Sequence, residues 1–210
     1  DRLSLFFEGL SITGLILLVK LTSWNMNKRK SGTWAYLLDA VKPDIAMLQE
    51  TSPIEGTVDP DKIHSLTIKR NLSNTVYVLS LLWEPVALPH EIGGTFVCVK
   101  VSPPNREALF IISIYRDLAF SPFFTVFIAQ ISLVVNHLRS VENAESIVLS
   151  GDFNCDRRMD ENPTSSRFAK RGERLTNLFF DSIIALGFRD GLAEKFPKFI
   201  QTHKNNRSNY

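Results

Sequence analysis

A short apolar run that ends abruptly in polar side chains is the feature that most restricts how this chain can fold. Residues 147–150 have the β-forming character of a buried strand, and after a glycine the chain presents Asp152 and Asn154. Because side chains alternate along a strand, these two point to one side and Phe153 to the other. A carboxylate and an amide add nothing to a hydrophobic core. We therefore expect something polar to lie above this strand end.

Two earlier runs end in the same way. Residues 15–23 are expected to enter a buried strand that stops at Asn25 and Asn27. Residues 45–48 are expected to form the next strand, which leads to Glu50. If the strands lie side by side, their polar ends converge on one edge. Each end alone also has an ordinary explanation, because polar residues after a strand often form a turn, a helix cap or a solvated loop.

The remaining segments predict further strands and covering helices. Apolar residues at helical spacing predict three helices, over 34–41, 123–141 and 175–186. Runs rich in β-forming residues, separated by prolines and glycines, predict consecutive antiparallel strands at 75–82, 95–101 and 108–115. The polar segment 55–73 is expected to be a loop. Strands mixed with a few covering helices indicate a layered α/β domain.

The composition fits a single domain with a large core. A chain of 210 residues buries roughly 70% of its unfolded surface, and 44% hydrophobic content with 22% charged content is ordinary for a soluble protein. The net charge of +2 is too small to indicate nucleic-acid binding by itself. Two cysteines, Cys98 and Cys155, indicate neither a disulfide framework nor a zinc cluster. We expect a cytoplasmic monomer.

The two ends of the chain set our expectations for the domain bounds. We expect residues 1–14 to be an N-terminal extension of uncertain order and residues 15–210 to be one domain. The apolar run 10–19 is shorter than the ~20 residues that span a bilayer. The sequence therefore gives no firm sign of a membrane segment, and a membrane anchor preceding Asp1 is the alternative.

The polar groups at the strand ends favour a hard cation. Glu50 and Asp152 provide carboxylates, while clustered cysteine or histidine is missing from these positions. Oxygen ligands of this kind suit magnesium or manganese. A site with such a cation suits hydrolysis of a phosphate ester, in which the metal polarises a phosphoryl oxygen and a carboxylate directs a water.

Three motifs, in this order along the chain, resemble the endonuclease/exonuclease/phosphatase superfamily. They are LTSWNMN at 21–27, KPDIAMLQE at 42–50 and VLSGDFN at 148–154. That superfamily includes AP endonucleases, DNase I-like nucleases, sphingomyelinases and inositol polyphosphate phosphatases. The resemblance covers roughly residues 15–192. It implies a four-layer sandwich of two mixed β-sheets flanked by helices.

The resemblance implies a role for each matching residue. Glu50 matches the family's metal-binding glutamate, and Asn27 falls where many members carry a metal-side aspartate or asparagine. Asp152 matches the aspartate that orients or activates the attacking water. Asn154 matches the asparagine that contacts the scissile phosphate, and Asn25 matches one that helps hold the site.

A tyrosine and two basic loops complete the expected site. Tyr115 ends a strand where nucleases of this family often place a phosphate-contacting tyrosine, although the usual proline-rich continuation is absent. An aromatic residue packed at a strand end is the alternative. Lys28, Arg29 and Arg157 follow the first and third motifs, and basic groups there would meet substrate phosphates. Solvated loop charge is the alternative reading of these three.

One departure from the family pattern widens the range of functions. The family closes its site with a later aspartate-bearing strand and a final Ser-Asp-His, and we expect the last strands to be missing from these 210 residues. The leading hypothesis is a magnesium-dependent, nuclease-like phosphodiesterase acting on DNA or RNA. The alternatives are a phosphomonoesterase or lipid phosphodiesterase of the same fold, and a non-catalytic domain.

Overall fold

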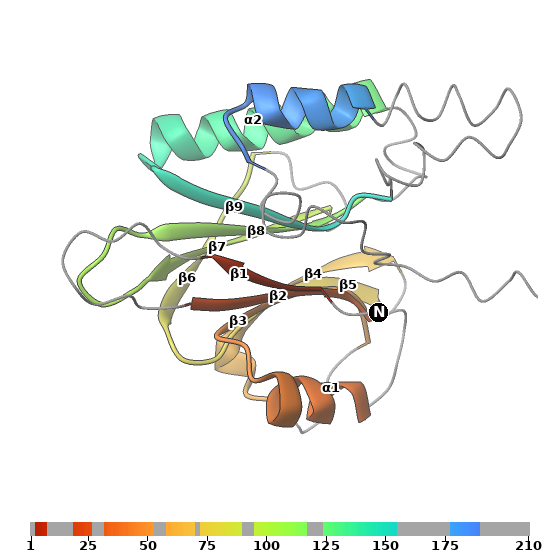
Figure 1. Ribbon diagram of the computed structural model, residues 1–210, viewed down its shortest axis with the longest axis vertical. Coiled ribbons are helices and arrows are strands. Elements are labelled where there is room, and N and C mark those ends of the chain that lie inside the picture. The colour runs from red at the N-terminus through yellow and green to blue at the C-terminus, as the bar shows by residue number, and fades with distance from the viewer. Residues whose placement is uncertain are drawn as a thin grey trace, which may run out of the picture.

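Two β-sheets pack face to face, and helices cover both outer faces (Figure 1). The computed structural model describes residues 3–7, 19–26, 32–52, 58–69, 72–89, 95–116, 124–154 and 177–189. The four layers in Figure 1 run from α1, through the two sheets, to α2 and the helix beside it. The predicted four-layer α/β architecture is therefore confirmed.

Within the described residues, the first sheet has five strands in the order β1-β2-β3-β5-β4. Their bounds are β1 (Leu3–Phe7), β2 (Val19–Asn25), β3 (Ile45–Thr51), β4 (Ile63–Lys69) and β5 (Leu72–Val78). Strands β2 and β3 run parallel, whereas the other neighbours are antiparallel. A parallel pair needs a crossover, and here it consists of α1 (Gly32–Tyr36) and a π-helical turn (Leu37–Val41).

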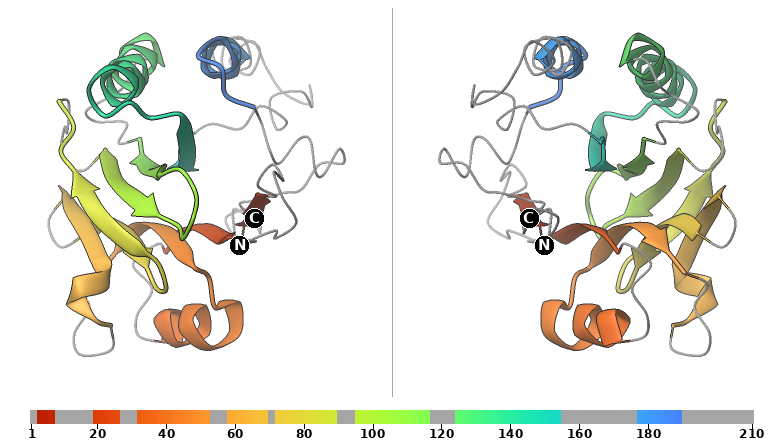
Figure 2. Two further views of the ribbon diagram at one scale, coloured as in Figure 1. Left: turned by 90° about the vertical axis from the view of Figure 1, so that its left-hand side faces the viewer. Right: turned by 90° about the vertical axis from the view of Figure 1, so that its right-hand side faces the viewer.

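The part of the second sheet that the structure describes has four strands, in the order β6-β7-β8-β9. Their bounds are β6 (Leu82–Val86), β7 (Phe96–Ser102), β8 (Leu109–Tyr115) and β9 (Ser146–Asp152). Only β8 and β9 run parallel, and α2 (Phe124–Val141) connects them. A further helix over 177–185 lies beside α2 on the same face (Figure 2).

Among the residues that the structure describes, three apolar clusters hold the layers together. Between the sheets, aliphatic side chains of β2, β3 and β5 meet those of β7 and β8. Trp34 and Leu37 pack on the outer face of the first sheet, and Phe127 and Phe179 lie in the cluster that covers the second sheet. Each fully buried side chain of this size contributes roughly 1.5–3 kcal/mol, so the three clusters carry most of the stability.

Three of the expected segments need correction. The segment 55–73 is not simply a loop, because a 3₁₀ turn (Pro60–Lys62) and strand β4 lie within it. Strand β4 is an edge strand that contributes few apolar side chains, so its own sequence signals a strand only weakly. Its pairing with β5 decides the conformation.

The run 75–82, expected to be one strand, is divided between the two sheets. Its first part belongs to β5 in the first sheet, and its last residue begins β6 in the second. Strand β6 also contains Pro85, which cannot donate to a ladder but is tolerated at the edge of a sheet. Strand β1 pairs with β2 from within residues 1–14, where no strand was expected.

Candidate active site

Four strand ends, two from each sheet, meet at one end of the sandwich. Strand β2 ends at Asn25 and the neighbouring β3 carries Glu50, while β8 ends at Tyr115 and the neighbouring β9 ends at Asp152. Both pairs of strands are parallel, so their carboxyl ends lie at the same edge of each sheet. The predicted convergence of polar ends occurs, but it arises from stacking of two sheets rather than from three neighbours in one sheet.

Asn25 and Asp152 join the two sheets directly. The Asn25 Nδ2 donates a hydrogen bond to Asp152 Oδ2 over 2.7 Å. Both side chains lie on the inner faces of their strands, as alternation from the buried Leu21 and the partly buried Val148 requires. The other carboxylate oxygen, Oδ1, accepts from the backbone N–H of Asn154 at 2.9 Å. Two donors thus hold the Asp152 carboxylate in one orientation.

Glu50 reaches the site because strand β3 is irregular. Simple alternation would place Glu50 on the same face as Leu48, which packs toward α1. The pairing of β3 with β5 shifts register between Leu48 and Thr51, and Glu50 has φ of +52°. A bulge of this kind re-aims a side chain at the cost of local strain. Here it turns the Glu50 carboxylate toward the second sheet.

Tyr115 is the hydrogen-bond partner of the Glu50 carboxylate. Its hydroxyl donates to Glu50 Oε1 over 2.9 Å, and its backbone N–H donates to the carbonyl of Thr95 at 2.9 Å. The tyrosine side chain is buried, with 6% of its surface exposed. The structure therefore pairs Tyr115 with Glu50, and a contact of its hydroxyl with a substrate phosphate stays a prediction.

Gly151 allows β9 to lie close enough to β8 for this arrangement. It has φ of +144°, and a Cβ at this position would collide with the backbone of Ile114. Asn154, with φ of +48°, follows in a left-handed conformation that asparagine tolerates. Its Nδ2 donates to the Arg116 carbonyl at 2.7 Å. Asp152 and Asn154 thus form a turn, and their catalytic role stays a prediction.

A magnesium ion would find few protein ligands among these residues. The part of the chain that the structure describes contains no group of three or more His, Cys, Asp or Glu placed to hold a metal. Glu50 offers Oε2, since Tyr115 occupies Oε1. Magnesium commonly binds one or two carboxylates and fills its other positions with water and substrate phosphate. The oxygen-only site with one available carboxylate therefore fits this ion.

Several expected site residues lie outside the described residues. These are Asn27, Lys28, Arg29 and Arg157. Their expected contacts with metal or phosphate remain predictions.

The sequence did not reveal a buried polar group under the site. Gln49, Ser113 and Asn74 have 1% or less of their surface exposed, and their side chains bond to one another between the sheets. A polar residue inside an otherwise apolar strand, such as Ser113 in LFIISIY, is the signal that could have indicated them.

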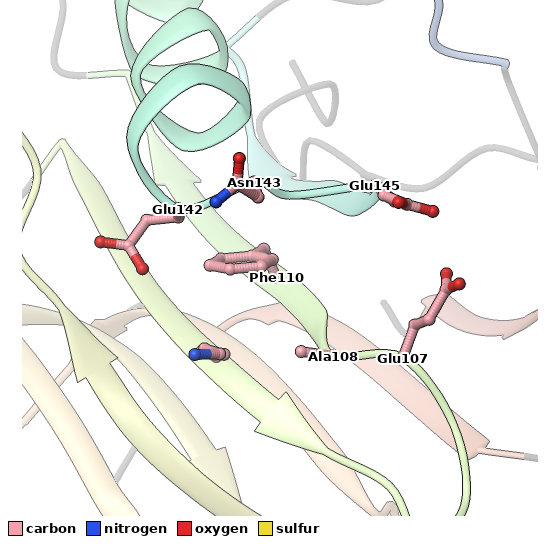
Figure 3. Close-up of a pocket in the computed structure, with 7 residues that line it drawn as sticks. Glu107, Ala108, Phe110, Glu142, Asn143 and Glu145 are labelled. Carbon is pink, nitrogen blue, oxygen red and sulfur yellow. The ribbon is translucent and has the colours of Figure 1, made fainter.

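The second sheet also has a pocket at its other end (Figure 3). It has a volume of about 160 Å³ and lies where β8 and β9 begin, with Glu107, Glu142 and Glu145 among its lining residues. Tyr115 and Asp152 lie at the opposite ends of these two strands. The pocket is therefore separate from the candidate active site.

Comparisons with known proteins agree with this architecture. Neither a protein-family profile nor a curated protein sequence matches the chain. Among solved structures, the chain is similar to the endonuclease domain of TRAS1, a telomere-specific non-LTR retrotransposon, with a TM-score of 0.54 and 14% identity. The match covers 80% of this chain and 71% of that one. The fold is DNase I-like.

At 14% identity the likeness shows the fold alone. The DNase I-like sandwich explains why polar ends from both sheets meet at one end of the molecule. Within the described residues, none of the helices has the length and apolar character needed to cross a membrane.

Proposed function

We propose that this chain is a divalent-metal-dependent hydrolase of phosphate esters, and specifically a nuclease-like phosphodiesterase. The observation that carries the proposal is the Asp152 carboxylate, held by Asn25 from the other sheet, at the same end of the sandwich as the Glu50–Tyr115 pair. Structural stability alone does not require two carboxylates there, since buried or half-buried acids cost free energy unless they are paired.

Glu50 is the residue we propose to hold the cation. Its Oε1 accepts a hydrogen bond from Tyr115, which limits rotation of the carboxylate and leaves Oε2 as the proposed ligand atom. Asn27 is proposed to add a second oxygen ligand. When bound, Mg²⁺ supplies positive charge that polarises a phosphoryl oxygen of the substrate.

Asp152 is the residue we propose to direct the attacking water. An ionised carboxylate has about four lone-pair positions, and the donors from Asn25 and Asn154 occupy two of them. The remaining positions can accept a hydrogen bond from water and orient it, or take its proton. Asn154, whose backbone N–H donates to Asp152, is proposed to contact the scissile phosphate.

Nucleic acid is the substrate class that we propose. The similar structure is named as an endonuclease domain, which supports this choice. Lys28, Arg29 and Arg157 come shortly after β2 and β9 in the sequence. Basic side chains near such a site would neutralise the phosphates of a polynucleotide.

Cleavage assays with the full-length protein test the proposal. We expect cleavage of DNA or RNA oligonucleotides with Mg²⁺ and none in excess chelator. Glu50→Gln and Asp152→Asn should each lower the rate by about 10³-fold or more, because both act on the reacting groups. Glu107→Gln, at the far end of the sandwich, is the matched control and should behave as wild type.

Two results would contradict the proposal. One is robust cleavage of nucleic acid in excess chelator. The other is hydrolysis of sphingomyelin or inositol phosphates at rates well above those on oligonucleotides, which would replace the substrate class while keeping the reaction.

A further inference from the structure

We infer that Gln49, Ser113 and Asn74 are positioning residues, which hold the Glu50–Tyr115 pair in the geometry that the site needs. This inference rests on the proposed function of that site. The three side chains lie between the sheets, and each comes from a different strand: β3, β8 and β5.

The three side chains form a continuous chain of hydrogen bonds. Gln49 Nε2 donates to Ser113 Oγ at 2.9 Å, and Ser113 Oγ donates to Asn74 Oδ1 at 2.6 Å. Asn74 Nδ2 then donates back to the Ser113 carbonyl at 2.9 Å and to the Thr95 carbonyl at 3.3 Å. The network therefore spans both sheets and is well satisfied.

The network reaches both partners of the Glu50–Tyr115 hydrogen bond. Gln49 immediately precedes Glu50, and its carbonyl accepts from the backbone N–H of Met26 at 2.8 Å. On the other side, the Thr95 carbonyl accepts from Tyr115 N–H as well as from Asn74. A displacement of the network would thus move the carboxylate and the hydroxyl relative to each other.

The bulge in β3 explains why Glu50 needs such support. Its φ of +52° is unfavourable for a glutamate and persists only if the neighbouring residues hold it. Gln49 anchors one side through the network. Thr51 anchors the other, since its Oγ1 bonds to the Ser73 carbonyl at 3.0 Å and to Thr75 Oγ1 at 2.9 Å. Without the Gln49 anchor, β3 can relax toward regular alternation, which returns Glu50 to the face that packs on α1.

Stability alone does not account for a buried polar network of this kind. Replacing such groups by apolar side chains of similar volume is often neutral or stabilising, whereas a partly satisfied network is costly. The network lies directly beneath a bulged carboxylate. Its position points to the accurate placement of Glu50 as its role.

The test compares two network variants with a matched core variant. Gln49→Met keeps the volume but removes the donor, and Ser113→Ala removes one oxygen. Val99→Ala, in the same layer between the sheets and 0% exposed, opens a cavity without touching the network. With an oligonucleotide substrate, kcat and the Mg²⁺ concentration for half-maximal rate are measured for each folded variant.

We expect both network variants to lower kcat by about 10–100-fold and to raise the Mg²⁺ requirement, because small misplacements of reacting groups have effects of this size. Val99→Ala should lower thermal stability while kcat stays within about twofold, since no polar contact is lost. Wild-type kcat and metal dependence in both network variants would overturn the inference.

A second readout does not depend on activity. The ¹³C NMR signals of the Glu50 carboxylate and of Tyr115 Cζ report their mutual hydrogen bond. We expect Gln49→Met and Ser113→Ala to shift both signals and Val99→Ala to leave them unchanged. If wild type does not cleave nucleic acid, the proposed function fails, but these shifts still decide whether the network positions the pair. Unchanged signals in both network variants would rule out a positioning role.

Discussion

Asn25 Nδ2 lies 2.7 Å from Asp152 Oδ2, and this hydrogen bond joins the last residue of β2 in one sheet to the last residue of β9 in the other. The two residues are 127 positions apart in the sequence. The bond both orients a carboxylate and ties the sheets together at the end where the site lies. Activity and stability should therefore respond together when it is removed.

Asn25→Ala should lower the free energy of unfolding by about 1–2 kcal/mol, as expected for a hydrogen bond to a charged group that is partly solvated. The cleavage rate should fall by about 10–100-fold, because Asp152 loses one of its two orienting donors. Chemical denaturation and steady-state kinetics measure the two effects. Asn136→Ala on the exposed face of α2 is the control, and an Asn25→Ala enzyme as fast as wild type would refute the orienting role.

Tyr115→Phe should reduce activity while leaving the fold intact. The change removes only the hydroxyl that donates to Glu50 Oε1, so the buried ring still packs. We expect a loss of about 1 kcal/mol in stability and a weaker response to Mg²⁺, because the Glu50 carboxylate becomes free to rotate. Metal titration of the cleavage rate checks this, and an unchanged titration curve would speak against the pairing.

The Glu50→Gly variant should be more stable than the Glu50→Ala variant. In a regular strand the order is the reverse, since glycine costs roughly 0.5–1 kcal/mol relative to alanine. Here the backbone has φ of +52°, which is unfavourable for alanine. In urea denaturation, the free energy of unfolding of Glu50→Gly should therefore exceed that of Glu50→Ala by about 1 kcal/mol. Both variants should be inactive. Equal stability of the two variants would mean that the bulge relaxes once the glutamate is gone.

Gly151→Ala should be among the most destabilising single changes in the chain. An added methyl group would collide with the backbone of Ile114, and φ of +144° is open only to glycine. We expect a loss of about 3 kcal/mol or more, together with loss of activity as Asp152 moves. Gly187→Ala is the control: its φ is +90°, but the nearest atom to its Cβ is Arg139 Nη2 at 3.5 Å, so only the backbone cost of about 1 kcal/mol applies. Similar losses in the two variants would contradict this reading.

Ionisation of Tyr77 should lower the stability of the fold at alkaline pH. Burial raises its pKa above the ordinary value of 10.0, and the nearby charge of Asp59 raises it further. The unfolded chain therefore releases this proton first as the pH rises, so folding stability should fall above pH 10 until the folded-state pKa is passed. Between about pH 9 and about 11, the free energy of unfolding should decline less steeply for Tyr77→Phe than for wild type in denaturation curves. The two slopes should differ by up to about 1.4 kcal/mol per pH unit, the value for one proton. Identical slopes would contradict the assignment.

Local patterns in the sequence were enough to predict where several strands end and which polar residues stand there. Apolar runs stop at Asn25, before Glu50 and before Asp152, and the structure places all three at one end of the sandwich. Alternation also predicted correctly that Asp152 and Phe153 face opposite ways, since Phe153 packs on the α2 side. These features are local, because the alternation of side chains along a regular strand depends on neighbouring residues.

Edge strands were harder to predict because long-range pairing decides them. Strand β4 gains its conformation from β5, and β6 tolerates Pro85 only because its outer edge is unpaired among the described strands. Neither condition can be read from the residues of the strand itself.

Only the tertiary structure decided how the site is assembled. The bulge at Glu50 overrides alternation, and the donor that fixes its carboxylate, Tyr115, comes from the other sheet. The support from Gln49, Ser113 and Asn74 exists because two sheets stack at this register and bring three distant polar side chains within hydrogen-bonding distance. The sequence by itself determined which polar groups end the strands, whereas the stacking of the sheets determined which of them meet, since hydrogen-bond geometry between distant segments depends on packing.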